Sequence, residues 1–195
     1  TEMTETKTGQ KRLRADAERN RQRLLQAAKE VFARDGASAS LEEIARTAGV
    51  GIGTLYRHFP SRDTLVEDVY RNAVVQLGEA AGQLAETHAP LDAIREWLLL
   101  FVDYISTKRI MTEAITALGG SADTLYAGTG DIMRNALADL VRRAEAAGDI
   151  RPVADPFDLL RAVAGVLYVS PAADPQAESG ARNVIDLLIA GLRKT

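Results

Sequence analysis

Residues 39–62 of this chain read ASLEEIARTAGVGIGTLYRHFPSR, and this stretch decides the fold. Ser40 followed by Glu43 is a capping box, in which each of the two side chains satisfies a backbone N–H group at the start of a helix. The apolar residues that follow recur at helical spacing and form one face. Gly49 stands where a residue in the left-handed conformation ends a helix. These features predict a short helix that begins after Ser40 and ends at Gly49.

A second short helix is predicted directly after this turn. It opens at Gly51 or Ile52 and runs to about Phe59, because Pro60 disfavours the helical conformation in the residue before it. Leu55 and Phe59 are four residues apart and face inward, whereas the rest of the circumference carries hydrogen-bonding, cationic and aromatic tips. Such a helix suits the major groove of DNA, where its N-terminal residues meet base edges and phosphates.

The helical pair closely resembles the DNA-binding signature of the TetR family of bacterial transcriptional regulators. Two positions depart from the commonest pattern: Gly51 stands where a serine often caps the second helix, and Arg62 stands where lysine is usual. The alternative is a buried helical hairpin, but such a hairpin would not place Tyr56, Arg57 and His58 on adjacent positions. The residues that carry the resemblance are Leu41, Ile44, Ala45, Ala48, Gly49, Val50, Gly53, Thr54, Leu55, Tyr56, His58, Phe59 and Leu65.

The resemblance implies an all-α fold with two domains. A helix over residues 15–34 would complete a three-helix, helix-turn-helix DNA-binding domain at residues 14–60, preceded by a flexible basic arm at residues 1–13. Residues 61–195 would form a helical effector-binding and dimerisation domain. The implied function is that of a sequence-specific DNA-binding transcriptional regulator, a repressor that a small-molecule effector releases from a palindromic operator. The alternative is a helical ligand-binding or protein-interaction module that keeps this architecture without regulating DNA.

The predicted DNA surface combines the second short helix with the basic arm. Tyr56 and Arg62 are expected to position the helix against phosphates rather than to specify bases. Two alternatives stay open: the arm as a solvated tail, and His58 as a histidine packed at the domain joint. The predicted DNA-binding residues are Lys11, Arg12, Arg14, Thr47, Gly51, Gly53, Thr54, Tyr56, Arg57, His58 and Arg62.

The distribution of charge supports this division. The chain has a net charge of −3, which by itself does not suit a DNA-binding protein. Residues 1–62 hold 12 basic and 8 acidic residues, a net charge of +4, and residues 63–195 hold 12 basic and 19 acidic residues, a net charge of −7. A basic head on an acidic body is the asymmetry expected of a protein that binds DNA with one end.

The rest of the chain is predicted to be helical. The helix that starts at Ser61 is too long for a three-helix domain alone, and we expect it to act as a lever between the domains. The helix over residues 92–106 is apolar all round and is expected to be central and buried. The further helices are expected at about 61–86, 92–106, 108–118, 131–147, 157–169 and 177–192. A loop is expected at 119–130, and the alternative is a loop with one helical turn around Ala122–Tyr126.

The last two predicted helices carry more apolar surface than a small monomer needs to bury. In TetR-like proteins the equivalent pair forms a two-fold dimer interface, and a homodimer would place two recognition helices ~34 Å apart on a palindromic DNA site. The alternative is that these helices only fill the monomer core. The predicted interface residues are Leu159, Ala162, Val163, Val166, Val184, Leu187, Leu188 and Gly191.

The resemblance also implies a pocket for a small-molecule effector. Such pockets are mainly apolar with a few polar groups. Every candidate residue is equally explained as core, and no charged residue is clearly buried, so the expectation is a moderately large, mainly apolar effector. The predicted pocket residues are Trp97, Phe101, Tyr104, Met111, Ile115, Tyr126, Met133 and Tyr168.

An enzyme site is not expected. The chain has no cysteine, its two histidines are His58 and His88, and the glycines at 51 and 53 lack the third glycine and the preceding strand of a phosphate-binding loop. We therefore expect no catalytic residue, no metal and no cofactor. No apolar run approaches the ~18 residues of a membrane span. The polar N-terminus and the absence of cysteine favour a cytoplasmic location without membrane contact.

Overall fold

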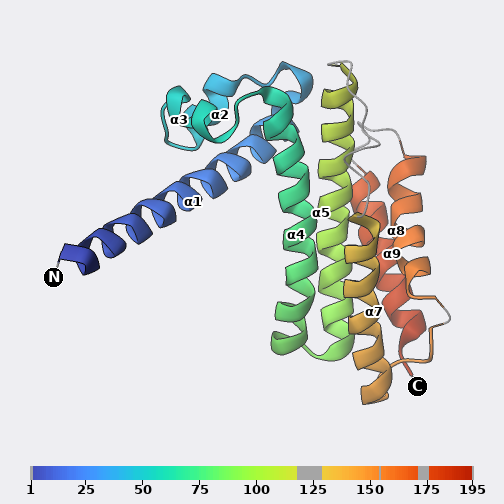
Figure 1. Cartoon of the computed structure of the whole chain (residues 1–195). Helices are drawn as coiled ribbons and strands as arrows, with labels where there is room; N and C mark the ends of the chain where they lie inside the picture. The colour runs from blue at the N-terminus through green and yellow to red at the C-terminus, as the bar shows by residue number, and fades with distance from the viewer. Residues whose placement is uncertain (1, 118–128, 154, 171–175, 195) are drawn as a thin grey trace. The chain divides into compact units, whose positions relative to one another are not determined.

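The structure is a computed structural model that describes residues 2–117, 129–153, 155–170 and 176–194 (Figure 1). The helices are α1 (Glu2–Asp35), the 3-10 turn η1 (Gly36–Ser38), α2 (Leu41–Thr47), α3 (Ile52–His58), α4 (Arg62–Thr87), α5 (Pro90–Ala117), α7 (Thr129–Ala147), α8 (Phe157–Val169) and α9 (Ala177–Leu192).

The described residues form helices and short connections, and the fold class is all-α as predicted. An isolated antiparallel bridge joins Ile150 and Arg193 near the ends of α7 and α9. Over the described part of the chain, no helix has both the length and the apolar character that crossing a membrane requires.

The chain divides into two compact units, which are described separately. The first comprises residues 1–70 and 110–120, and the second comprises residues 71–109 and 121–195. The division falls within α4 and within α5, so each of these helices contributes to both units. The domain boundary that the sequence suggests, between residues 60 and 61, stays a prediction.

The core of the first unit is built from α1, the two short helices and the start of α4. Phe32 of α1, Ile44 of α2 and Leu55 of α3 are fully buried in one cluster. Phe59 and Leu65 complete this cluster and are also fully buried. Full burial of an apolar side chain of this size contributes about 1.5–3 kcal/mol. Phe32 is therefore a central residue of this core.

The turn between α2 and α3 has the geometry that the glycine predicts. Gly49 has a φ of +66°, its N–H donates to the carbonyl of Arg46 at 3.1 Å, and the N–H of Val50 donates to the carbonyl of Ala45 at 3.0 Å. These two bonds form a Schellman motif, which satisfies the last carbonyls of α2. The chain then turns and begins α3 at Ile52.

In the second unit, α5 lies against α4 and α9. Trp97 of α5 is fully buried, and its indole Nε1 donates to the carbonyl of Leu77 in α4 at 2.9 Å. Arg95 of α5 forms an ion pair with Asp186 of α9 at 2.8 Å. The helices α8 and α9 pack against each other, and α7 packs against α8 (Figure 1).

Predicted helix ends in the second unit are confirmed with small shifts. The helix α8 begins at Phe157 as predicted, and the carboxylate of Asp155 accepts a hydrogen bond from the backbone N–H of Phe157 at 2.9 Å, which satisfies one of the first N–H groups of the helix. Gly148 follows α7 with a φ of +78°. The last helix has the predicted bounds, whereas α7 begins at Thr129, two residues before the predicted start.

The N-terminal segment differs from its prediction. Residues 2–13, expected to be a flexible arm, are the first turns of α1, which runs from Glu2 to Asp35 rather than from about residue 15 (Figure 1). This segment has one glycine and no proline, and most of its residues favour helices. Once the packed half of α1 has formed, each further residue adds a backbone hydrogen bond without a new nucleation cost.

The helix α5 corrects a second prediction. Two helices were expected over residues 92–106 and 108–118, but one helix runs from Pro90 to Ala117. The hydroxyl of Thr107 donates to the carbonyl of Asp103 at 2.9 Å, so this polar residue is satisfied within its own helix and does not end it. The helix is also not buried all round, because Leu100 is exposed. The loop predicted at residues 119–130 lies outside the described residues up to residue 128.

Gly49→Ala tests whether the left-handed turn stabilises the first unit. No atom lies within 4 Å of the added Cβ, so the expected cost is conformational, about 1–2 kcal/mol of unfolding free energy. Gly82→Ala in α4 is the matched control, because it also has open space but an ordinary φ, and it should stabilise the protein slightly. Chemical denaturation measures both variants, and equal stability of the two would contradict the assignment.

Candidate nucleic-acid interface

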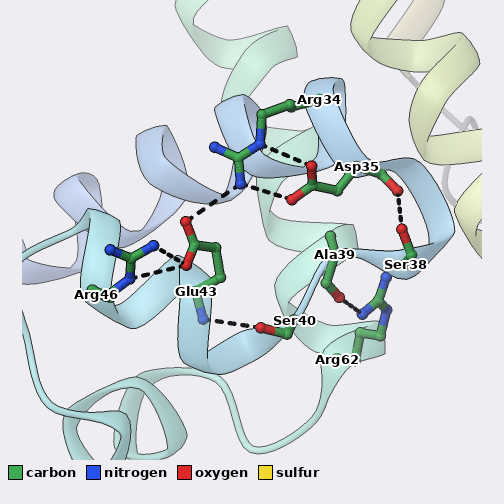
Figure 2. A network of polar contacts seen from close by, with 8 residues as sticks. All are labelled: Arg34, Asp35, Ser38, Ala39, Ser40, Glu43, Arg46 and Arg62. Carbon is green, nitrogen blue, oxygen red and sulfur yellow. Dashed lines mark hydrogen bonds and ion pairs between the residues drawn. The ribbon is translucent and has the colours of Figure 1, made fainter.

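A network of charged side chains joins the end of α1 to α2 (Figure 2). Arg34 donates two hydrogen bonds to the carboxylate of Asp35, at 2.8 and 2.7 Å, and its Nη2 lies 3.3 Å from Oε1 of Glu43. Arg46 donates to Oε2 of Glu43 from Nε at 3.0 Å. Hydrogen bonds from Arg34 lower the pKa of Asp35, and those from Arg46 are the main cause of the lowered pKa of Glu43. The network therefore holds α2 against the end of α1.

The network also corrects half of the predicted capping box. The hydroxyl of Ser40 accepts from the N–H of Glu43 at 3.0 Å, as expected. The carboxylate of Glu43 was expected to reach back to a backbone N–H group, but it faces Arg34 and Arg46 instead (Figure 2). The two guanidinium groups of Arg34 and Arg46 offer opposite charge and several donors to the carboxylate, whereas the backbone would offer a single neutral N–H group.

The outward face of α3 has little side-chain cover at its start. Gly51 and Gly53 are both exposed, and a Cβ atom at either position would meet no atom within 4 Å. Tyr56, which follows one turn later, is 48% exposed, whereas Leu55 beside it is fully buried. The buried side anchors the helix, and the exposed side leaves its backbone open to close approach by another molecule.

Arg57 lies along this exposed face. Its Nε donates to the carbonyl of Gly53 at 3.2 Å, and its Nη2 donates to the hydroxyl of Thr54 at 3.2 Å. All three residues are on the predicted DNA surface. The guanidinium is exposed, so it can exchange these weak local bonds for a phosphate or a base edge.

Arg62 does not lie on the open face where it was predicted. It is half-buried, its Nη1 donates to the carbonyl of Ala39, and its guanidinium lies over the ring of Phe32 at 5.1 Å (Figure 2). The guanidinium group of Arg62, at the start of α4, therefore packs against α1 and against the turn before α2. The reason is tertiary, because the phenyl ring and the carbonyl that attract Arg62 come from residues distant in sequence.

The remaining predicted DNA-binding residues have mixed positions. Thr47 is exposed at the end of α2, and Arg14 is exposed on α1. Lys11 and Arg12 lie in the first turns of α1, and their side chains are outside the described part of the structure. His58 is half-buried, with its ring centroid 6.2 Å from that of Phe59.

One exposed residue of α3 was not predicted. Ile52, the first residue of the helix, is exposed, although it lies three residues before the buried Leu55. An exposed aliphatic side chain beside two bare glycines can contact the methyl group of thymine in the major groove. Apolar periodicity alone assigns Ile52 to the inward face, because it lies three residues before Leu55. Its position in the first turn of a short helix was the signal for exposure, because that turn extends beyond the core that covers the later residues.

The predicted dimer residues divide between core and surface. Leu159 and Val163 are buried within the chain, so the prediction that they lie at a dimer interface is wrong for these two residues. Leu187 and Gly191 are exposed, and Ala162, Val166, Val184 and Leu188 are half-buried. Val169, at the end of α8, was not predicted and is the most exposed of the large apolar side chains described, at 88%.

Only some of the predicted pocket residues line a cavity. Phe101, Tyr104, Met133 and Tyr168 line a cavity of the second unit. Trp97 is a core residue that bonds to α4, as described above. Met111 and Ile115 lie in α5, but their side chains are not described, and Tyr126 is outside the described residues.

Two short helices joined by a left-handed glycine, with the second held by its buried side and bare on its outer side, define a helix-turn-helix protein. Residues 24–69 match the family model of bacterial regulatory proteins of the tetR family, and residues 89–194 match the C-terminal domain of SbtR-like transcriptional regulators. The chain belongs to the TetR family of bacterial transcriptional regulators.

Two solved structures resemble most of the chain. The TetR transcriptional regulator SCO0520 of Streptomyces coelicolor is 39% identical with a TM-score of 0.80, and the match covers 90% of this chain and 99% of that one. A TetR transcription regulatory protein from Mycobacterium vanbaalenii is 31% identical with a TM-score of 0.74, covering 93% and 99% of the two chains. The HTH-type transcriptional regulator UidR of Escherichia coli K12 is 34% identical over 54% of this chain and 46% of its own length, so the match spans about half of that curated relative.

Gly53→Ala tests the DNA-contact surface of α3 independently of the stability of the helix. The added methyl group lies within a helix and meets no atom within 4 Å, so the unfolding free energy should rise by about 0.5–1 kcal/mol. Affinity for mixed-sequence duplex DNA should fall severalfold, because the methyl group covers the bare backbone. Gly82→Ala is the control, which should stabilise without changing DNA affinity. A stabilised Gly53→Ala variant with unchanged DNA affinity would contradict the interface.

Proposed function

We propose that this chain is a DNA-binding repressor that acts as a homodimer on a palindromic operator and is released by a small-molecule effector. The observation that carries the proposal is the outer face of α3, where Gly51 and Gly53 leave the backbone open and Tyr56 and Arg57 supply polar tips. Bases are read through such a face in the major groove, and the phosphate contacts beside it set the register.

Electrostatics supports the orientation of this protein on DNA. Residues 1–62 carry a net charge of +4 and residues 63–195 a net charge of −7. The acidic part is repelled by the phosphate backbone of DNA. The protein is therefore expected to approach DNA with its helix-turn-helix end facing the duplex. An effector shifts the equilibrium toward release only if it binds the released arrangement more tightly than the DNA-bound one.

Dimerisation is proposed to use the outer sides of α8 and α9. Val169 is 88% exposed and Leu187 is 72% exposed, so these outward sides offer apolar side chains that a partner would bury. Gly165 and Gly191 are exposed, with no atom within 4 Å of an added Cβ, so a second copy can approach these helices closely. Inward, α8 buries Leu159 and Val163, and α9 buries Ile185 and Ile189, so the outward residues of the two helices are the part available to a partner.

Selection of bound duplexes from a random DNA library, at two salt concentrations, tests the proposed function. We expect a palindrome whose half-site centres lie about 34 Å apart, since two recognition helices of a dimer enter successive major grooves. Binding should weaken steeply with salt because phosphate contacts release counterions. Arg57→Ala should reduce the salt slope by about 1 if Arg57 contacts a phosphate. Arg143→Ala, an exposed cation of α7, is the control and should change neither quantity. No binding at low salt would contradict the proposal.

Sedimentation at micromolar concentration tests the dimer. The wild-type chain should sediment at twice its mass of 21.0 kDa. Leu187→Glu should yield the 21.0 kDa species, because it buries an unpaired charge in the interface. Val75→Glu places the same charge at an exposed apolar position of α4 and should remain dimeric. A wild-type protein that sediments as a monomer, or an equal effect of both variants, contradicts the proposed interface.

A further inference from the structure

The start of α3 presents one side chain between two residues that have none. Ile52 is the first residue of the helix, and Gly51 and Gly53 stand on either side of it. A Cβ atom at either glycine would meet no atom within 4 Å, so the space beside them is open. Because Ile52 is exposed, its side chain is the one that this end of α3 offers to an approaching molecule.

The core of the first unit does not account for this side chain. Leu55, three residues later in α3, is fully buried in the same cluster as Ile44 of α2. Among the described residues, Ile52 belongs neither to the buried members of that cluster nor to the partly buried ones packed against it. A single exposed aliphatic residue is ordinary on a protein surface. The position of Ile52 on the helix, and not its exposure alone, therefore carries the argument.

The position of Ile52 is one that contacts bases in helix-turn-helix proteins. In such proteins the N-terminal residues of the second helix meet base edges in the major groove. Residues 24–69 match the family model of tetR-family regulators, and α3 is the second helix of the motif. Ile52 and Gly53 are the first two residues of α3, and of these two only Ile52 has a side chain.

The chemistry of an isoleucine side chain limits which base it can recognise. The side chain has no donor and no acceptor, so it forms no hydrogen bond with a base edge. The base edges in the major groove consist of hydrogen-bonding groups, except for the C5 methyl group of thymine. Contact between this methyl group and an aliphatic side chain removes apolar surface of both from water. The amino group of cytosine at the same place would lose water without gaining a partner.

We propose that Ile52 recognises one thymine in each half of the operator, through contact between its side chain and the C5 methyl group of that base. Such a contact brings heavy atoms within about 4 Å of each other. The open backbone at Gly51 and Gly53 permits this approach, because neither residue adds a side chain that would hold the DNA away. The inference rests on the proposed function, since it requires an operator, and it adds which base one position of that operator holds.

Uracil substitution tests the contact, because uracil keeps the base pairing of thymine and lacks its C5 methyl group. The operator selected from the random library is resynthesised with deoxyuridine in place of one symmetric pair of thymines at a time. We expect one pair at which uracil lowers the affinity of the wild-type chain about fourfold for each methyl group removed, the effect of burying one such group. With Ile52→Ala, uracil at this pair should lower affinity less than twofold, because its partner is already missing.

Val75→Ala is the matched control. Val75 is also an exposed aliphatic residue, but it lies on α4 in the second unit. Its replacement should change neither the affinity for the operator nor the effect of uracil. Chemical denaturation identifies a damaged fold, and Ile52→Ala should unfold close to the wild-type midpoint because it removes exposed atoms only. A folded Ile52→Ala variant that keeps the full effect of uracil at every thymine overturns the inference.

Ile52→Gln supplies a result that a purely structural role would not produce. A glutamine amide can bind N6 and N7 of adenine with two hydrogen bonds. Library selection with this variant should therefore return adenine in place of thymine at the assigned position and leave the rest of the half-site unchanged. Loss of the thymine preference supports the assignment whichever base replaces it, and selection of the same thymine by a folded Ile52→Gln variant overturns it.

The failure of this inference differs from the failure of the proposed function. If the wild-type chain selects an operator in which no thymine is invariant, or in which no thymine is sensitive to uracil, the operator stands and recognition by Ile52 is wrong. If no duplex is bound even at low salt, the proposed function is wrong, and recognition of a base by Ile52 is wrong with it.

Discussion

The left-handed backbone at Gly49 is the constraint on which the helix-turn-helix depends. At a φ of +66° this residue ends α2, satisfies its last carbonyls and redirects the chain before α3. A residue with a Cβ atom adopts this conformation only at a cost. The redirection buries Leu55 and exposes Tyr56 on the same short helix, so one backbone angle decides both the core contact and the contact surface.

The basic stretch at residues 1–62 uses much of its charge for packing within the first unit. Arg21 pairs with Asp68 at 2.8 Å and lies over the ring of Phe59, while Arg34 bridges α1 to α2. Arg62 turns inward over Phe32. Net charge therefore predicts which end of the protein attracts DNA, because Coulomb forces act at long range, but it does not identify the side chains that contact DNA.

In the second unit, a single helix can contribute residues to the core, to the cavity and to the exposed surface. In α8, Leu159 and Val163 pack into the core, Leu160 lines the cavity, and Val169 is exposed. These roles differ by one or a few positions, because each residue advances the helix by about 100°. A small shift of α8 within the unit would change the cavity and the outward face together, which is a physical route for linking ligand binding to assembly.

The sequence by itself determined the all-α class, the glycine turn at Gly49, the serine cap at Ser40 and the start of α8. These features depend on interactions between residues only a few positions apart. The tertiary structure alone decided that α5 continues through Thr107, that Arg62 faces inward, and that α8 divides its apolar residues between core and surface. Apolar periodicity marks a face but not what covers it, because the covering residues come from distant parts of the chain.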